Sequence, residues 1–279
     1  MRFITLNNGV RMPQFGLGTY KVEAGESAYE TVLAALKVGY RMFDTAKMYH
    51  NESDIGRAIR DSKIDRSEIF VTSKIYKLYH GDQSKIEKDI LDSLEKINLG
   101  YIDLMLIHWP SPDPEINLKA WQVLEKFYEK GLIKAIGVSN FRIHHIDYLV
   151  KYAKIKPAMN QVECHPLLSQ EPLLNHLKKL NINMTSYGPF AKGRVFEAPT
   201  SEALTEIAKK YDATISQIII AWGLKRGIVM IPKTVHEERL IENFNALNIE
   251  LSDEDLIKIN ALNRGQNVYT DPDNNPFTE

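Results

Sequence analysis

The chain has 279 residues, a length at which one closed α/β barrel can account for the whole sequence. Apolar residues make up 44% and charged residues 25% of it, which argues against a disordered chain. The 35 Lys and Arg residues nearly balance the 36 Asp and Glu residues, so the sequence lacks the basic excess that nucleic acids and anionic membranes attract.

The single cysteine and the absence of long apolar runs indicate the compartment. Cys164 has no partner for an intramolecular disulfide, which favours a reducing environment. The N-terminus has no apolar signal-peptide core, and no run approaches the ~18 apolar residues of a membrane helix. We therefore expect a cytoplasmic monomer with no nucleic-acid or membrane partner.

The predicted elements begin with two short β-type runs at residues 4–13, joined by Asn-Gly, which is typical of a hairpin. Amphipathic helical patterns then separate eight β-rich segments. In one of these patterns Ile86, Ile90 and Leu94 recur at helical spacing. The β-rich segments are 14–20, 39–44, 68–75, 101–109, 133–140, 157–163, 182–188 and 227–233.

Strands that alternate with helices predict parallel β/α units, and eight such units close a (β/α)8 TIM barrel. The opening hairpin is expected to close the barrel floor. Several helices are expected to end at a glycine, including Gly39, Gly100 and Gly131. A capped helix at 251–262 and a polar tail complete a single predicted domain, 1–279.

A doubly wound dinucleotide-binding sheet is the competing architecture, and its glycine-rich fingerprint should follow the first strand. Gly16 and Gly18 fit the start of that pattern, but Lys21 stands at the position of the third glycine. The segment "GPFAKGR" has Arg194 where a phosphate-binding P-loop has Lys. Both patterns fail.

Polar side chains stand at the ends of the predicted strands, and in a β/α barrel these ends share one rim. Asp44, Lys74 and His108 end the second, third and fourth strands, and Tyr49 follows Asp44 in the loop. Each also has a simpler interpretation: a backbone cap for Asp44, a solvated lysine, a half-buried histidine and a packing tyrosine. Their convergence on one rim favours a functional cluster.

These four residue types make a proton-delivery device. A phenol has a pKa of ~10, which a nearby ammonium group is expected to lower. A carboxylate keeps that ammonium charged, and a histidine can donate a hydrogen bond to a carbonyl oxygen. Reduction of a carbonyl also needs a hydride, which no side chain supplies and a nicotinamide does.

At these residues the chain resembles the aldo-keto reductase family. The stretch "GYRMFDTAKMYHNESDIG" looks like a family signature, "VTSKI" carries the lysine and "LIHWP" the histidine. "GVSNF", "NQVECHP" and "IPKT" follow in the family order, so the resemblance covers essentially the whole chain.

The resemblance implies an NADPH-dependent reduction of a small-molecule carbonyl substrate, with NADP+ as the oxidised cofactor. It implies that Tyr49 is the general acid, that Asp44 and Lys74 tune its pKa, and that His108 orients the carbonyl. It further implies a set of cofactor contacts. They are Ser139, Asn140 and Gln161 on the carboxamide, Tyr187 stacked on the nicotinamide, Lys233, Thr234 and Arg239 at the 2′-phosphate, and Glu242 and Asn243 near the adenine.

Physical chemistry supports the assignment of Lys233, Thr234 and Arg239 to the 2′-phosphate. A 2′-phosphate is a dianion, which cations, a hydroxyl and a helix start all favour. A solvated basic turn is the simpler alternative. With the resemblance, we expect NADPH to be preferred over NADH.

The chain departs from the family after the stacking tyrosine, where the family often has Ser-Pro and this chain has Gly188 followed by Pro189. Gly188 lacks a side chain for the pyrophosphate, although its backbone can approach closely. Lys192 and Arg194 in the same loop are expected to supply that contact instead.

The substrate pocket is expected to contain Tyr20, Met48, His50 and Trp109. The loops are short, as in the bacterial and protozoal members that reduce aldehydes, α-dicarbonyls and keto-sugars such as 2,5-diketo-gluconate. No metal site is expected.

Two other functions remain open at this stage. A non-catalytic NADPH-binding protein could share the fold, although all four catalytic residue types are present. An unrelated barrel enzyme could use Lys74 to form a Schiff base.

Overall fold

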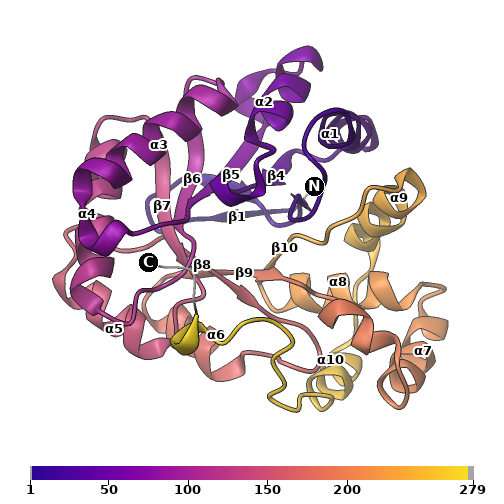
Figure 1. Cartoon of the computed structure of the whole chain (residues 1–279). Helices are drawn as coiled ribbons and strands as arrows, with labels where there is room; N and C mark the ends of the chain where they lie inside the picture. The colour runs from indigo at the N-terminus through magenta and orange to yellow at the C-terminus, as the bar shows by residue number, and fades with distance from the viewer. Residues whose placement is uncertain (1, 276–279) are drawn as a thin grey trace.

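Eight parallel strands stand side by side in chain order and are surrounded by helices (Figure 1). The computed structural model describes residues 2–275. Each of the eight predicted segments contains one strand of this sheet. The strands are β3 (Leu17–Gly18), β4 (Met42–Asp44), β5 (Phe70–Ile75), β6 (Ile102–Ile107), β7 (Ile133–Ser139), β8 (Met159–Glu163), β9 (Asn183–Tyr187) and β10 (Val229–Met230).

The first and last strands of the sheet meet and close the ring. Phe15 and Met230 form a parallel bridge, and the Gly16 N–H donates to the Met230 carbonyl at 3.0 Å. Further along, the Gly18 N–H donates to the carbonyl of Pro232 at 3.2 Å. The predicted (β/α)8 barrel is therefore confirmed.

Helices connect the strands. The helical pattern of Ile86, Ile90 and Leu94 is found in α3 (Gln83–Ile97), and the helix expected at 251–262 is found as α10 (Asp253–Asn260). The expected glycine end of α3 is wrong: Asn98, with φ 48°, takes the left-handed conformation there, and Gly100 follows outside the helix. The helices are α1 (Glu26–Val38), α2 (Glu52–Asp61), α3 (Gln83–Ile97), α4 (Pro114–Glu129), α5 (Ile143–Tyr152), α6 (Glu171–Lys179), α7 (Thr200–Lys210), α8 (Ile215–Lys225), α9 (Glu237–Asn245) and α10 (Asp253–Asn260). Within residues 2–275, no helix combines the length and apolar character needed to cross a membrane.

The N-terminal hairpin, β1 (Phe3–Thr5) and β2 (Arg11–Pro13), closes the barrel floor as expected. Asn7 donates to the Pro157 carbonyl at 2.8 Å and Asn8 to the Lys134 carbonyl at 2.9 Å, so the turn is tied to the starts of β7 and β8. The hairpin also inserts two apolar side chains, Leu6 and Met12, into the barrel interior.

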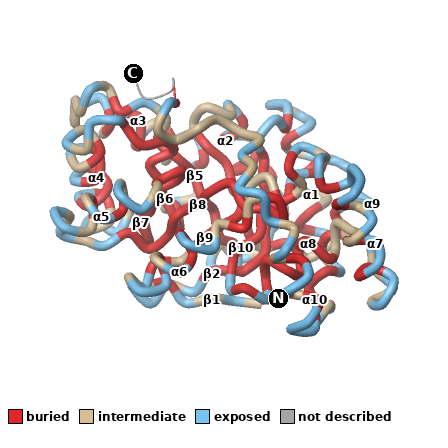
Figure 2. Tube along the Cα trace, turned by 90° about the horizontal axis from the view of Figure 1, so that it is seen from below, coloured by how far each residue is buried: buried red, intermediate tan, exposed pale blue. Residues whose placement is uncertain are grey.

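The core has two layers, and buried positions follow the strands and the inward sides of the helices (Figure 2). The outer layer lies between sheet and helices. The inner layer fills the lower barrel with side chains that include Met42, Leu104, Leu106 and Met159. This packed interior leaves the C-terminal rim as the place for a site.

Candidate active site

The structure brings the four predicted catalytic residues together at the C-terminal rim. The Lys74 Nζ donates to Asp44 Oδ1 at 2.5 Å, to the Thr45 carbonyl at 2.8 Å and to the Tyr49 hydroxyl at 3.5 Å. The rings of Tyr49 and His108 meet edge to face, with centroids 5.7 Å apart. Lys74 and Asp44 are a buried ion pair, with side-chain exposures of 0% and 5%.

A buried asparagine holds the loop that carries Tyr49. Asn51 accepts a hydrogen bond from the Thr45 hydroxyl at 2.7 Å and donates to the carbonyls of Thr19 and Val22, each at 3.1 Å. A short 3-10 helix, Lys47–Tyr49, lies between these anchors. The hydrogen bonds of the Asn51 side chain thus hold the loop backbone and, with it, Tyr49. Sequence reasoning assigned Asn51 no role.

The surroundings of Lys74 oppose the Schiff-base alternative. An ammonium group has three N–H donors, and all three have acceptors here. Burial lowers the pKa of Lys74, while the carboxylate of Asp44 favours the charged form. The nitrogen therefore offers no free lone pair to a carbonyl carbon.

The expected lowering of the Tyr49 pKa is wrong for this state of the protein. Burial of the phenol raises its pKa well above the usual value, and the negative charge of Asp44 adds to the effect. Desolvation outweighs the ammonium group because Lys74 lies 3.5 Å from the hydroxyl and is itself paired with Asp44. The phenol thus stays protonated near neutral pH.

His108 is held neutral. Burial lowers its pKa well below the usual value, and the charge of Lys74 lowers it further. Its Nδ1 is buried without a hydrogen-bond partner among residues 2–275. A neutral imidazole at this position can orient a carbonyl through one N–H donor.

Four polar side chains form a second cluster beside this one. Parallel pairing places Ser139 next to Gln161, and the Ser139 hydroxyl donates to the Gln161 carbonyl at 2.8 Å. Asn140 accepts from the Tyr187 hydroxyl at 2.7 Å. Gln161 donates to Asp44 Oδ2 at 2.7 Å, which leaves its amide a second N–H and a carbonyl oxygen. The cluster can therefore still bind an amide.

Both clusters open into one cavity of ≈ 590 Å³, within the usual size range of ligand sites. Of the residues expected around the substrate, Tyr20, Met48 and Trp109 line it. His50 is exposed and does not line it, and the nearby Lys47 pairs with carboxylates on α3. The cavity-lining residues that sequence reasoning assigned no role include Lys21, Phe190, Phe196, Ile231, Tyr269 and Thr270.

The residues expected to bind the 2′-phosphate lie around the start of α9. Lys233 lines the cavity, Thr234 accepts from the His236 N–H at 3.1 Å, and Arg239 is exposed in the first turn. Neither Lys233 nor Arg239 forms an ion pair with another residue between positions 2 and 275. Both are free to meet an anion.

The two residues expected near an adenine have protein surroundings of their own. Glu242 accepts from the Thr214 hydroxyl at 2.6 Å, at the start of α8, and Asn243 is buried in α9. Neither lines the cavity.

Gly188 has φ 59°, and a Cβ built there would lie 2.5 Å from the ring of Tyr269. The C-terminal segment therefore fills the place of the missing side chain. Lys192 lines the cavity and donates to the Val268 carbonyl at 2.7 Å, whereas Arg194 is exposed and does not line it.

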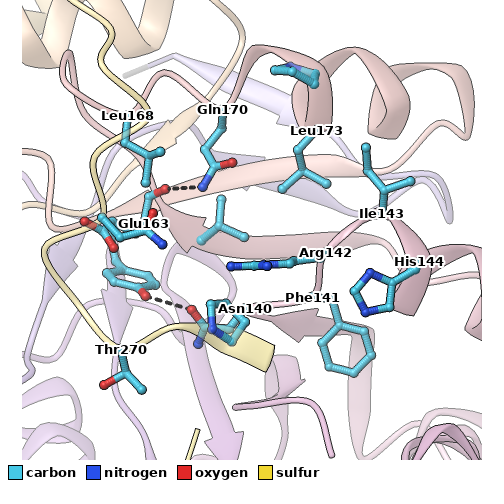
Figure 3. A pocket seen from close by; sticks show the side chains of 16 residues that line it. Asn140, Phe141, Arg142, Ile143, His144, Glu163, Leu168, Gln170, Leu173 and Thr270 are labelled. Atoms are coloured by element: carbon cyan, nitrogen blue, oxygen red, sulfur yellow. Dashed lines mark hydrogen bonds between the residues drawn. The ribbon is translucent and has the colours of Figure 1, made fainter. Parts of the chain in front are cut away.

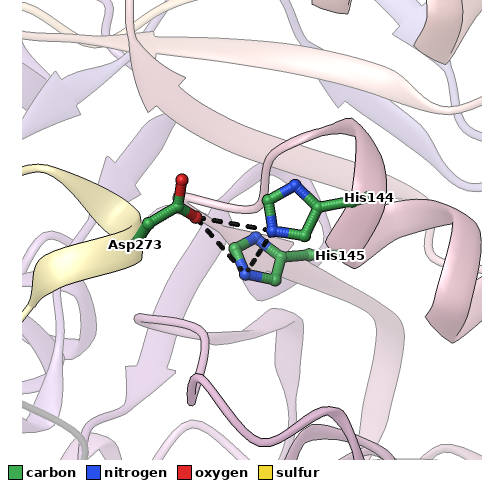
Figure 4. A group of neighbouring side chains, drawn as sticks. All are labelled: His144, His145 and Asp273. Atoms are coloured by element: carbon green, nitrogen blue, oxygen red, sulfur yellow. Dashed lines mark hydrogen bonds and ion pairs between the residues drawn. The ribbon is translucent and has the colours of Figure 1, made fainter.

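His144, His145 and Asp273 form a group that has the composition of a metal site (Figure 4). The His145 Nδ1 accepts the Arg142 N–H at 3.1 Å, so the proton of the neutral ring is on Nε2, the nitrogen that faces the other two residues. Arg142 also pairs with Asp273. This geometry favours an ionic anchor of the C-terminal segment over metal coordination.

The barrel carries its cluster of acid-base groups on one rim, an arrangement typical of an enzyme. The Aldo/keto reductase family model matches residues 14–264. The chain is 44% identical over 270 residues to glyoxal reductase from Bacillus subtilis, covering 97% of this chain and 96% of that protein. This chain belongs to the aldo/keto reductase family and is an oxidoreductase.

Solved structures agree with this assignment. An aldo-keto reductase from a Medee basin deep-sea metagenome, MGS-M4, superposes with a TM-score of 0.94 at 42% identity, covering 99% of this chain and 100% of that one. A Bombyx mori aldo-keto reductase in complex with NADP superposes with a TM-score of 0.89 at 33% identity, covering 99% and 97%.

Proposed function

We propose that this enzyme reduces small aldehydes and ketones to alcohols, with NADPH as cofactor and Tyr49 as the proton donor. The observation that carries the proposal is the contact of the Tyr49 hydroxyl with the buried Lys74–Asp44 pair, beside a neutral His108 in one cavity. Bound NADPH would supply the hydride.

The protein's part is to hold and move one proton. His108 donates a hydrogen bond to the substrate carbonyl and orients it. As negative charge develops on that oxygen, it becomes basic enough to take the proton of Tyr49. Lys74 then stabilises the phenolate that remains, because its ammonium group already lies 3.5 Å away.

The residues around the cavity fit this cofactor. Ser139, Asn140 and Gln161 would bind the carboxamide, and Tyr187 would stack on the nicotinamide ring. Lys233, Thr234 and Arg239 would hold the 2′-phosphate. The cationic groups of Lys233 and Arg239, which are free of ion pairs within residues 2–275, support this role. Gly188 would allow close approach of the backbone, and Glu242 and Asn243 would lie near the adenine. The bound state of the Bombyx mori relative supports the choice of NADP(H).

Small α-dicarbonyls are the proposed substrate class. The curated relative at 44% identity is a glyoxal reductase, and the side chains Tyr20, Met48 and Trp109 line the cavity together with His108. His50 would act at most from outside the cavity. We further propose a cytoplasmic monomer of one domain; a single closed barrel carries every proposed site residue, which supports the one-domain organisation.

The test is the oxidation of NADPH by the purified enzyme with a panel of carbonyl compounds. Glyoxal and methylglyoxal should be reduced with higher kcat/KM than bulky ketones or keto-sugars. Failure of every carbonyl to oxidise NADPH contradicts the proposed activity. A clear preference for keto-sugars contradicts only the substrate class.

A further inference from the structure

The last part of the described chain, residues 264–275, forms a strap across the rim. In Figure 1 this yellow segment runs from α10 toward α5 and α6. The N–H groups of Arg264 and Gln266 donate to the Leu167 carbonyl at 3.1 and 3.2 Å. Near its other end, Arg142 pairs with Asp271 at 2.6 Å and with Asp273.

The middle of the strap is held by one buried carboxylate, that of Glu163 at the end of β8. Its Oε1 accepts the Val268 N–H at 2.7 Å, and its Oε2 accepts the Tyr269 N–H at 3.2 Å. The His165 ring donates to Oε1 at 2.9 Å. Glu163 is only 5% exposed, so these bonds are shielded from water.

Glu163 lies beside a second cavity of ≈ 470 Å³, which shares Asn140, Tyr187 and Thr270 with the first. Figure 3 shows Gln170 next to Glu163; its side-chain amide donates to the Glu163 backbone carbonyl at 2.9 Å. The wall between the two cavities therefore contains Tyr187, the residue proposed to stack on the nicotinamide.

The hydrogen bonds from the Val268 and Tyr269 N–H groups to the Glu163 carboxylate place the side chain of Tyr269 against that wall. Its ring meets the Tyr187 ring edge to face, with centroids 5.3 Å apart, and occupies the space beside Gly188. The Lys192 Nζ lies 4.4 Å from the Tyr269 ring centroid and donates to the Val268 carbonyl. The strap and the loop after β9 thus meet over the cavity.

We propose that Glu163 is a positioning residue for the cofactor: it fixes Tyr269 against Tyr187 and holds the strap closed over the cavity. This inference rests on the proposed use of NADPH. Glu163 itself does not line the first cavity, so it acts through Tyr269 and not by contact with the cofactor.

The experiment measures the release of NADPH. Enzyme loaded with NADPH is mixed rapidly with excess NADP+, and the loss of bound-NADPH fluorescence gives the dissociation rate. Glu163→Gln places an amide N–H₂ against a backbone N–H and should raise this rate about tenfold, the effect of one lost charge-assisted hydrogen bond. Tyr269→Ala should raise it at least as much.

The double variant decides whether the two residues act together. If Glu163 works through Tyr269, Glu163→Gln has no further effect in the Tyr269→Ala background. Multiplied effects of the two changes contradict the inference, and so does a wild-type rate for Glu163→Gln. Glu206→Gln, an exposed change on α7, serves as the matched control.

A third variant covers the event that Glu163→Gln does not fold. Gly188→Ala displaces the Tyr269 ring without touching Glu163, so it should speed the release of NADPH. In the Tyr269→Ala background, Gly188→Ala should have no further effect on the release rate. An unchanged rate in Gly188→Ala contradicts the role of Tyr269. Wild-type protein that fails to bind NADPH contradicts the proposed cofactor instead, which keeps the two failures distinct.

Discussion

Asp44 and Gln161, 117 positions apart in the chain, are joined by a hydrogen bond of 2.7 Å. The other oxygen of the same carboxylate accepts from Lys74. One carboxylate therefore connects the proton-donating cluster with the cluster proposed to bind the carboxamide. The side chains that would hold the cofactor and those that would deliver the proton share a fixed geometry.

Loss of one partner of the buried ion pair should be costly. Lys74→Met leaves the carboxylate of Asp44 buried without its cation, so we expect the free energy of unfolding to fall by about 3–5 kcal/mol. The double variant with Asp44→Asn should lose clearly less than the sum of the two single changes. Urea unfolding of all four proteins measures both quantities, and simple additivity argues against the pairing.

Tyr49→Phe removes the proposed proton donor and keeps the ring. Turnover should drop by about 10²- to 10⁴-fold, the usual worth of general acid catalysis, while the Kd for NADPH stays near the wild-type value. Tyr152→Phe, at an exposed position on α5, is the control. Turnover near that of wild type would rule out Tyr49 as the donor.

The pH profile should be flat over an unusually wide range. A proton donor is active while protonated, so reduction slows only as the pH rises through the pKa of Tyr49, which is raised above ~10. His108 stays neutral until the pH falls below its lowered pKa, under ~6.5. We expect kcat/KM to change little between these limits, whereas a midpoint near 6.5 assigned to His108 would contradict its neutral state.

Lys233 and Arg239 should set the choice of cofactor. Replacing both by Met should weaken NADPH binding by about tenfold or more for each lost charged contact, and NADH binding much less. Dissociation constants for both cofactors measure the preference, with Lys179→Met on α6 as a control. An unchanged ratio of the two constants would remove these residues from the phosphate site.

The hairpin floor should affect stability and leave the reaction unchanged. Met12→Ala opens a cavity in the inner core layer and should cost about 2–5 kcal/mol of unfolding free energy. Its kcat/KM should equal that of wild type, because the site lies at the opposite end of the barrel. A large loss of activity at a temperature where the variant is folded would show that floor and rim are coupled.

The cluster that we propose to be catalytic could be predicted from the sequence because barrel strands end on one rim. Asp44 ends β4, Lys74 is the penultimate residue of β5 and His108 directly follows β6, so local patterns were enough to bring them together. Tyr269 could not be found in this way, because it reaches the cavity from an irregular tail through bonds to Glu163, more than a hundred positions earlier. No periodicity encodes such a contact.

The expectations for the Tyr49 pKa and for the place of His50 failed or fell short for physical reasons. The direction of the Tyr49 pKa depends on burial, which a sequence does not display, and burial outweighs the ammonium group. His50 is exposed and stays outside the cavity lining; its left-handed backbone, at φ 60°, ends the 3-10 helix that carries Tyr49.

The sealed floor has a kinetic consequence for Tyr49. Beneath Lys74 the barrel interior is filled by apolar side chains, and the hairpin covers its lower end. Under the proposed mechanism, the phenolate left after one turnover recovers its proton from water that enters through the rim. Product release and reprotonation of Tyr49 would then both take place through the rim. Slow product release would therefore also delay the reprotonation that the next cycle needs.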